Sequence, residues 1–396
     1  MTALPRISQS PTDPAFVQDP YAFYDRLRPM GPLVFWEEYG MPVAAGYAEV
    51  NALLRDRRLG REVPAELAPK IPNRLAPFYD IEAHSMLELE PPRHTRLRGL
   101  VVRAFTSRRI AALGPEIETL CHALIDGFPD GDFDLLQTYC TQVPVIVIAR
   151  LLGVPDSMAP DLLRWSNAMV SMYQARRDRA VEDAAIAASA DFAAFMRDYV
   201  DRRRNDPRDD LITQLIQAEE NGERLTTDEL ITTCILLLNA GHEATVHTLG
   251  NGIKALLEHG TDPSFMAADR VEATVEEILR FDAPLHMFTR QVYEDVELFG
   301  HRFGRGDRIA CLLGAANRDP ALADDPARFD PSRTPGANAA FGAGIHFCVG
   351  APLARLEMQI ALRVLFDRLP GLKLAEPPRY GDVYHFHGLT GLRVSA

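Results

Sequence analysis

One long helical segment restricts the fold of this chain more than any other feature. The sequence predicts it from about residue 227 to residue 259. Thr226 and Glu229 stand at its start in the spacing of a capping box, in which each side chain satisfies a backbone N–H at the helix end. Gly260 follows as a stop signal. The segment therefore predicts a helix that needs a body of other elements around it.

Most of the remaining pattern is also helical. Further helices are expected at about 108–127, 143–152, 157–174, 180–204, 208–221, 271–281 and 352–369. Short β-prone pieces at 33–37, 42–45, 289–292, 296–298, 308–312 and 392–394 suit small β ribbons rather than a large sheet. The proline-rich first 45 residues predict an extended entry with one short helix, and the irregular stretch 60–92 predicts a functional loop. With no repeat or clear linker, residues 1–396 are expected to form a single, mainly α domain.

Composition narrows the classes of function. Forty-two Lys+Arg against 55 Asp+Glu give a net charge of -13, which argues against general nucleic-acid binding. The apolar runs are too short or interrupted to span a bilayer, and no basic and apolar leader begins the chain, so no membrane anchor is expected. The five cysteines are scattered without a CxxC pair, which fits a reducing, cytoplasmic setting.

The most informative segment surrounds Cys348, in the ten residues Phe341-Gly-Ala-Gly-Ile-His-Phe-Cys-Val-Gly350. A helix is expected to open directly afterwards, with Pro352 in its first turn. The positive end of the helix dipole and its free N–H groups favour a thiolate at Cys348. Glycines without Cβ would let the loop lie against a flat ligand. The alternative interpretation is an inert cysteine beside a tight turn.

The whole segment reads F-G-x-G-x-H-x-C-x-G without a mismatch, and in this it resembles the cytochrome P450 family. The resemblance runs through nearly the whole chain and implies the family's helical prism with small β-sheets. It implies haem b (iron protoporphyrin IX), bound non-covalently with the Cys348 thiolate as axial ligand to the metal. Phe341, Gly342 and Gly350 then belong to the haem-binding loop.

Other motifs extend the resemblance. Glu277 and Arg280 match the family's E-x-x-R, and Arg333 completes a Glu-Arg-Arg network that supports the cysteine loop. Four basic residues match the family's partners for the two haem propionates, where forked donors suit carboxylates. These are His94, Arg98, Arg290 and His346.

The predicted long helix carries the family's oxygen-binding motif with one departure. Ala240, Gly241 and Glu243 match, but Ala244 replaces the threonine that the family uses to deliver protons. Thr245 cannot replace it, because one residue along a helix turns the side chain by ~100°. We expect an ordered water or a substrate hydroxyl to fill this role, with Glu243 still relaying protons.

Two histidines flank this motif. His242 and His247 are interpreted as packing or capping residues rather than iron ligands, because a thiolate already supplies the axial bond.

The resemblance implies a monomeric monooxygenase that inserts one oxygen atom from O2 into a small-to-medium apolar substrate. Hydroxylation, O-demethylation and epoxidation remain open, and electrons would come from a ferredoxin and its reductase. The expected substrate-lining residues are Leu236, Asn239, Leu285, Met287 and Phe288. Six arginines between residues 93 and 109 either form the face that docks the donor or are plain basic surface. A peroxide-driven peroxygenase, a nitric oxide reductase and a haem-binding sensor are the alternatives.

Overall fold

The long central helix is present in the computed structural model, which describes residues 3–173, 177–220 and 223–395. Helix α12 spans Thr227–Glu258 and begins with both halves of the predicted capping box. It ends beside Gly260, whose φ of +58° lies in the left-handed region that glycine adopts without strain. The expected beginning and end of this helix are therefore confirmed.

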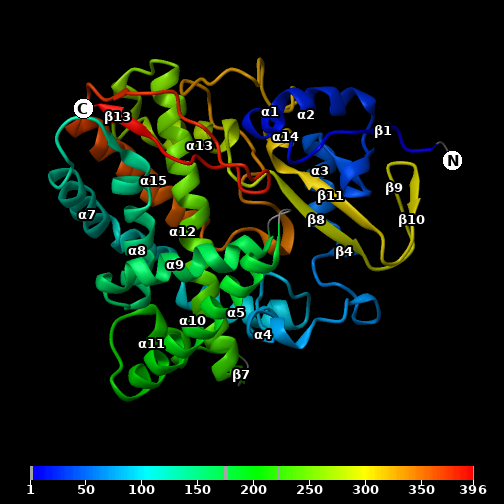
Figure 1. Ribbon diagram of the computed structural model, residues 1–396, viewed down its shortest axis with the longest axis horizontal. Coiled ribbons are helices and arrows are strands. Elements are labelled where there is room, and N and C mark those ends of the chain that lie inside the picture. The colour runs from blue at the N-terminus through cyan, green and yellow to red at the C-terminus, as the bar shows by residue number, and fades with distance from the viewer. Residues whose placement is uncertain (1–2, 174–176, 221–222, 396) are drawn as a thin grey trace.

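Helix α12 runs through the helical part of the molecule (Figure 1) and is buried on most of its circumference. A helix with apolar residues all round needs neighbours on every side. Its neighbours are α8 (Gln142–Leu152), α9 (Ala159–Val170), α10 (Arg179–Asn205), α13 (Val271–Phe281) and α15 (Ala351–Arg368). Together they enclose the largest hydrophobic cluster.

The remaining helices depart most from the sequence prediction. They are α1 (Pro14–Gln18), α2 (Tyr21–Leu27), α3 (Tyr47–Arg55), α4 (Ala76–Glu82), α5 (Arg93–Ala104), α6 (Ser107–Ala112), α7 (Gly114–Asp126), α11 (Leu211–Gln217) and α14 (Leu313–Asn317). The expected 108–127 helix is divided into α6 and α7, because Pro115 cannot donate the backbone hydrogen bond that a continuous helix requires. Helix α4 lies inside the stretch that was expected to be irregular.

Six strands form one mixed sheet, seen on the right of Figure 1. Their order is β1 (Arg6–Ile7), β2 (Val34–Trp36), β3 (Met41–Ala44), β11 (Arg308–Leu312), β8 (Met287–Val292) and β4 (Leu59–Gly60). The expectation of small β-sheets on a mainly α body is confirmed, and the parallel pairing of β3 with β11 joins two hairpin-like units into this sheet. The other sheets are small. In one, β13 (Arg393–Ser395) lies between β12 (Lys373–Leu374) and β5 (Phe133–Asp134). The other two are the pairs β9 (Val296–Leu298) with β10 (His301–Phe303) and β6 (Glu219–Glu220) with β7 (Glu223–Arg224).

A segment from the first forty residues and one near residue 384 meet in an aromatic core. Phe16, Trp36 and Tyr384 pack there with ring centroids 4.9 to 5.8 Å apart. The hydroxyl groups of Tyr24 and Tyr384 lie 2.8 Å apart across 360 positions of sequence. The segment after residue 380 is thus fixed against the N-terminal helices.

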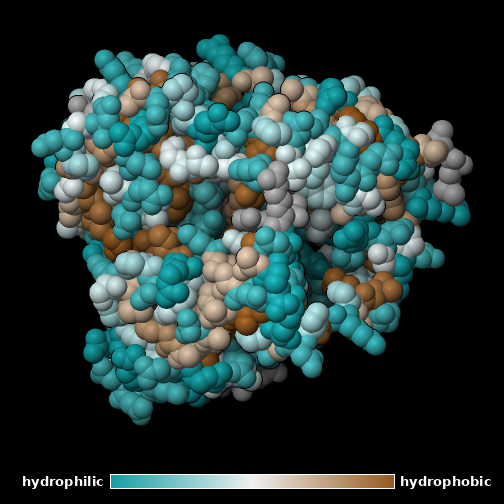
Figure 2. All heavy atoms as spheres, viewed as in Figure 1, coloured by the Kyte–Doolittle hydropathy of each residue, from teal (hydrophilic) through white to brown (hydrophobic). Residues whose placement is uncertain are grey.

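On the face drawn in Figure 2, hydrophilic side chains predominate and hydrophobic ones gather in patches. Among the described residues, no helix combines the length and the apolar character needed to cross a bilayer.

Candidate active site

The loop around Cys348 joins a short 3-10 helix, Gly344–His346, to the N-terminus of α15. The backbone N–H of Cys348 donates to the Phe341 carbonyl at 3.0 Å, which closes the loop on itself. The Phe341 ring lies beneath the guanidinium of Arg355, 4.6 Å from its centroid. Cys348 is exposed, whereas the other four cysteines are buried, so only its sulfur is presented for binding.

Two glycines in this loop are required by the backbone. Gly342 and Gly344 have φ values of +68° and +72°. A Cβ at residue 344 would overlap the carbonyl oxygen of Leu54, at the end of α3. The absence of a Cβ at Gly344 therefore permits close approach to the backbone of α3, whereas the sequence had suggested close approach to a flat ligand. Gly350 has an ordinary φ, and a Cβ there would lie 3.8 Å from the Cys348 sulfur.

The surroundings of Cys348 act on its pKa in opposite directions. Desolvation by the enclosing protein is the largest influence and raises the pKa of the thiol above its usual value. Hydrogen bonds from the backbone N–H groups of Gly350 and Ala351 lower it, as do the charges of Arg98 and Arg355. The N–H groups at the start of α15 thus act in the expected direction, towards the thiolate, and desolvation acts against them. A coordinated metal cation would add to the influences that favour the thiolate.

Behind the loop, the structure brings Glu277, Arg280 and Arg333 together. Arg280 donates from Nε and Nη2 to the two oxygens of Glu277 at 2.7 and 2.8 Å. Arg333 Nε lies 3.5 Å from Oε1, and the Asp330 N–H donates to the same oxygen at 2.8 Å. Bidentate pairing with further hydrogen bonds compensates the cost of burying these charges.

A second connection, which the sequence did not reveal, ties the stretch before the loop to the same helices. Asn338 donates to Glu276 on α13 at 3.1 Å, and Arg355 on α15 donates to that glutamate at 2.5 Å. Asn317 accepts the Ala339 N–H at 2.6 Å. Polar side chains on α13, α14 and α15 thus hold the entry to the cysteine loop.

The four predicted propionate partners lie near the loop but differ in their contacts. The rings of His94 and His346 are 4.5 Å apart. Arg98 donates to the Phe347 carbonyl at 2.7 Å. His346 Nε2 lies 2.8 Å from Glu90, a partner that the sequence reading missed although Glu90 precedes the Pro-Pro-Arg-His94 segment. Burial, His346 and Arg98 lower the pKa of His94 to about 4, so that ring is neutral.

The surroundings of Arg290 show whether these residues fit an anionic ligand. The residue is 2% exposed, and its guanidinium donates to the carbonyl of Thr289, 2.9 Å away. Within the described ranges, Glu90 and Glu88 act on it through their charge and without a hydrogen bond. Burial lowers its pKa, although a guanidinium stays charged at neutral pH. The buried Nδ1 of His94 also lacks a partner among the residues that the structure describes. These donors fit the carboxylates of a haem.

One face of α12 is open where the rest of the helix is buried. Ala240 is exposed and Ala244 half-buried, whereas Leu237, Leu238, Thr245 and Val246 of the same helix are buried. A Cβ at Gly241 would lie 3.2 Å from Ile148 on α8, so this glycine serves helix packing. The hydroxyl of Thr245 donates back to the Gly241 carbonyl at 3.2 Å, away from the position that Ala244 leaves without a hydroxyl.

Glu243 lies between two histidines of its own helix. His242 Nε2 is 3.5 Å from one carboxylate oxygen, and His247 Nε2 is 3.5 Å from the other. Burial raises the pKa of the Glu243 carboxyl, but a hydrogen bond from His247 and the charges of both histidines outweigh it. Its pKa therefore lies below the ordinary value.

The expected substrate residues divide into two groups. Leu236, Asn239, Leu285 and Phe288 are half-buried, and the Asn239 oxygen is buried without a partner in the described chain. Met287 instead packs in the N-terminal aromatic core. Successive strand residues point to opposite faces, so Met287 and Phe288 on β8 cannot line one cavity.

A buried polar cluster lies beside these residues. Asp282, His286 and His387 place potential ligand atoms within 4.8 Å of one another. Both oxygens of Asp282 already accept hydrogen bonds, from Tyr21 at 2.8 Å and from Tyr380, and His286 is bonded to Tyr24 at 2.7 Å. The cluster connects α2, the start of β8 and the C-terminal segment.

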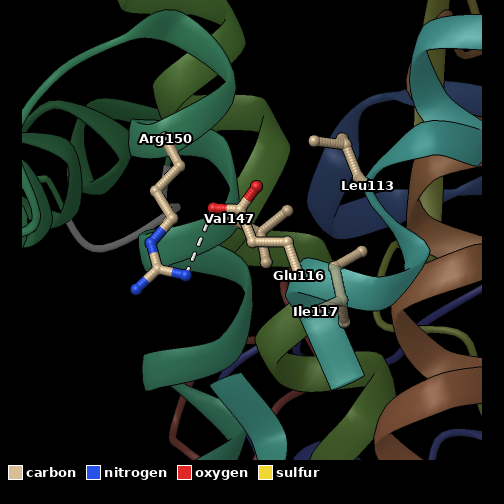
Figure 3. Close-up of a pocket in the computed structure, with 5 residues that line it drawn as sticks. All are labelled: Leu113, Glu116, Ile117, Val147 and Arg150. Carbon is tan, nitrogen blue, oxygen red and sulfur yellow. Dashed lines mark hydrogen bonds and ion pairs between the residues drawn. The ribbon is translucent and has the colours of Figure 1, made fainter. Parts of the chain in front are cut away.

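Two recesses lie away from Cys348. The small one in Figure 3 is lined by Leu113, Glu116, Ile117, Val147 and Arg150, and an ion pair of 3.2 Å crosses it. A larger groove of about 470 Å³ lies between α4, α10 and α12 and contains the Arg197–Asp228 ion pair. None of the predicted site residues lines either recess.

Comparison with known proteins agrees with this geometry. The family description "Cytochrome P450" matches residues 133–262 and 269–369. Cytochrome P450 monooxygenase PikC of Streptomyces venezuelae is 38% identical over 376 residues, 92% of this chain and 87% of the relative. 6-Deoxyerythronolide B hydroxylase of Saccharopolyspora erythraea is 36% identical and covers 94% and 93% of the two chains. The crystal structure of P450BioI with an acyl carrier protein superposes with a TM-score of 0.90 at 32% identity, over 96% of this chain and 99% of that one.

This chain belongs to the cytochrome P450 family. It is an oxidoreductase of the monooxygenase class and has the mainly α fold of that family, whose members carry a haem-thiolate cofactor.

Proposed function

We propose that this protein is a ferredoxin-dependent monooxygenase that oxidises a small-to-medium apolar substrate at a non-covalently bound haem b. The observation that carries the proposal is Cys348, the one exposed cysteine, on a loop that closes on itself before the N-terminus of α15. When bound, the haem supplies an iron centre that activates O2 for insertion of one oxygen atom.

Three sets of residues in this chain would bind the haem or stabilise its binding loop. Cys348 offers the axial sulfur, and the N–H groups of Gly350 and Ala351 hydrogen-bond to it. Arg290, His94 and Arg98 offer positive charge or donors to carboxylates. Glu277, Arg280 and Arg333 stabilise the segment that carries the loop.

The substrate class rests on the residues around the open face of α12. Leu236, Leu285 and Phe288 supply apolar surface, and Asn239 offers one carbonyl oxygen that lacks a partner in the described chain. A mostly apolar lining with few polar groups orients an apolar molecule that carries one or two donors. Hydroxylation, O-demethylation and epoxidation share this arrangement.

The proposed ferredoxin face comprises α5 and α6, which carry the six arginines between residues 93 and 109. Arg98 of α5 contacts the backbone of the cysteine loop directly, so this face lies next to Cys348. Arg96 and Arg109 have acidic partners in Glu229 and Asp209. A basic surface would steer an acidic electron donor towards the loop. We further propose that residues 1–396 form one domain, monomeric and cytoplasmic.

The absorption spectrum of the dithionite-reduced protein under carbon monoxide tests the proposal. We expect a Soret band shifted far to the red, as thiolate-ligated haem gives, and loss of this band in Cys348→Ser. Cys121→Ala, at a buried cysteine, is the matched control and should keep the band. A band at the position of histidine-ligated haem, or no bound haem, would refute the proposal.

A further inference from the structure

The proton state of Glu243 is constrained by the orientation of His242. His242 Nδ1 lies 2.7 Å from the Leu238 carbonyl, which can only accept, so Nδ1 carries the proton. In a neutral His242 the other nitrogen, Nε2, is then a lone pair, and it faces a Glu243 oxygen at 3.5 Å. Two acceptors at this distance repel unless a proton lies on one of them. Burial lowers the pKa of His242, which favours the neutral ring with its lone pair towards Glu243, so the carboxylate depends on its other oxygen for a proton donor.

His247 faces the second oxygen of Glu243 from one helical turn further along α12, where residues i and i+4 are neighbours. Its Nε2 points to Glu243, so its Nδ1 lies on the other edge of the ring. That Nδ1 is buried and has no hydrogen-bond partner in the described part of the chain. The side chain is 18% exposed, against 2% for His242, so water reaches the ring of His247 and scarcely reaches His242.

The C-terminal segment makes room for this ring. A Cβ at Gly388 would overlap His247 Nδ1, so the ring occupies the space that the glycine leaves. Asn251 of α12 donates to the carbonyls of His387 and Asp282 at 2.8 and 3.2 Å, which fixes the segment against the helix. His247 is thus held between Glu243 and a glycine that admits it.

We propose that His247 is a positioning residue that supplies protons to Glu243, in a His242–Glu243–His247 triad that compensates for the hydroxyl missing at Ala244. This inference rests on the proposed monooxygenase function, because the protons are consumed in oxygen activation. A packing role alone does not require a histidine whose nitrogen faces the Glu243 carboxylate.

The transfer is a balanced proton exchange. A proton leaves Nε2 of the charged His247 ring and binds Oε1 of Glu243, which leaves a neutral imidazole and a carboxylic acid. The carboxylic acid releases the proton to water in the open strip beside Ala244. Nδ1 keeps its proton, and Nε2 of His247, whose side chain is 18% exposed, regains one from water. No electron or further reactant is needed.

The charges around His247 come from two elements. On α12 they are Glu243 and His242. On the C-terminal segment the facing group is His387, whose pKa burial lowers to about 3, so it is neutral near pH 7. Behind it, His387 Nε2 lies 3.7 Å from Asp282, whose oxygens accept from Tyr21 and Tyr380. The Glu243 carboxylate is thus the acid nearest to His247.

The first test measures the protonation of Glu243 in the holoprotein as a function of pH. The carboxyl carbons of glutamate are observed by ¹³C NMR in the diamagnetic ferrous carbonyl form, and Glu243→Gln assigns the signal. His247→Asn should raise the pKa of Glu243, because it removes the hydrogen bond and charge that lower it. His259→Asn, at the C-terminal end of the same helix, is the matched control and should leave it unchanged. An unaltered Glu243 titration in His247→Asn would overturn the inference.

The second test is the pH profile of NADH consumption with saturating ferredoxin and reductase. We expect His247→Asn to slow consumption by about tenfold, less than the roughly 10²–10⁴-fold of direct general acid–base catalysis because His247 acts through Glu243, and to change the shape of the profile. A purely structural role would lower the rate equally at every pH, and that outcome would refute the proposal. The carbon monoxide spectrum of each variant distinguishes failure of the His247 role from failure of the proposed monooxygenase function. A red-shifted band with an unaltered profile rejects the role of His247 alone, whereas a missing band in the unsubstituted protein rejects the proposed function.

Discussion

Two glutamates, Glu277 on α13 and Glu243 on α12, have opposite surroundings. Glu277 is 4% exposed and is bound by Arg280, by Arg333 and by the Asp330 N–H, each from a fixed direction. Glu243 is held by two histidines at 3.5 Å, and each histidine has one nitrogen without a hydrogen-bond partner in the described chain. A fully satisfied polar network rigidifies its region. Around Glu243 some hydrogen-bonding groups lack a partner in the described part of the protein and lie beside an open helix face. These groups can bind water or a ligand and can exchange protons.

The largest effect is expected from breaking the satisfied network. Glu277→Ala leaves two guanidinium groups without their carboxylate, so we expect a loss of about 3–5 kcal/mol in the free energy of unfolding. Chemical denaturation of the holoprotein measures it. Glu272→Ala, at an exposed position of the same helix, is the control and should change little. A loss below about 1 kcal/mol for Glu277→Ala would mean that the network is not a main support.

A smaller effect is expected where His247 meets Gly388. Gly388→Ala forces the His247 ring to shift, and overpacking of this kind costs about 1–3 kcal/mol. In a His247→Ala background the same change should cost much less, because the added methyl group then has room. The double-mutant cycle measures this coupling from denaturation curves. Additive effects would show that the strain lies elsewhere.

The smallest effect on stability is expected for a surface carboxylate, which is neither buried in a satisfied network like Glu277 nor held between histidines like Glu243. Glu116 is half exposed and pairs with Arg150 across the recess in Figure 3, while Arg150 also binds Asp156 at 2.7 Å. Glu116→Gln should therefore cost below about 1 kcal/mol, and added salt should reduce that cost further. Thermal unfolding at two salt concentrations measures it. A cost comparable to that of Glu277→Ala would contradict the distinction drawn from burial and partners.

Features with local causes were predictable from the sequence. The capping box at Thr226 and Glu229 and the stop at Gly260 are set by neighbouring residues, and the ends of α12 follow them. The i, i+3 pair of Glu277 and Arg280 is likewise local, and the resemblance supplied Arg333.

Features decided by tertiary contacts were not predictable. The pKa of Cys348 depends on desolvation by distant parts of the chain, which outweighs the helix N-terminus that the sequence displays. The strand register sends Met287 into the core and Phe288 to the other face, although they are adjacent. The Glu90–His346 contact joins residues 256 positions apart and leaves no local pattern.

The contact between early and late segments of the chain has a consequence for the order of events during synthesis. Tyr24 emerges early from the ribosome, but its partner Tyr384 emerges 360 residues later, and the Gly388 segment that seats His247 follows it. The N-terminal aromatic core and the surroundings of Glu243 can therefore be completed only after residue 388 has been synthesised. Until then the surfaces that Tyr384 and the Gly388 segment cover stay open to aggregation and to chaperone binding.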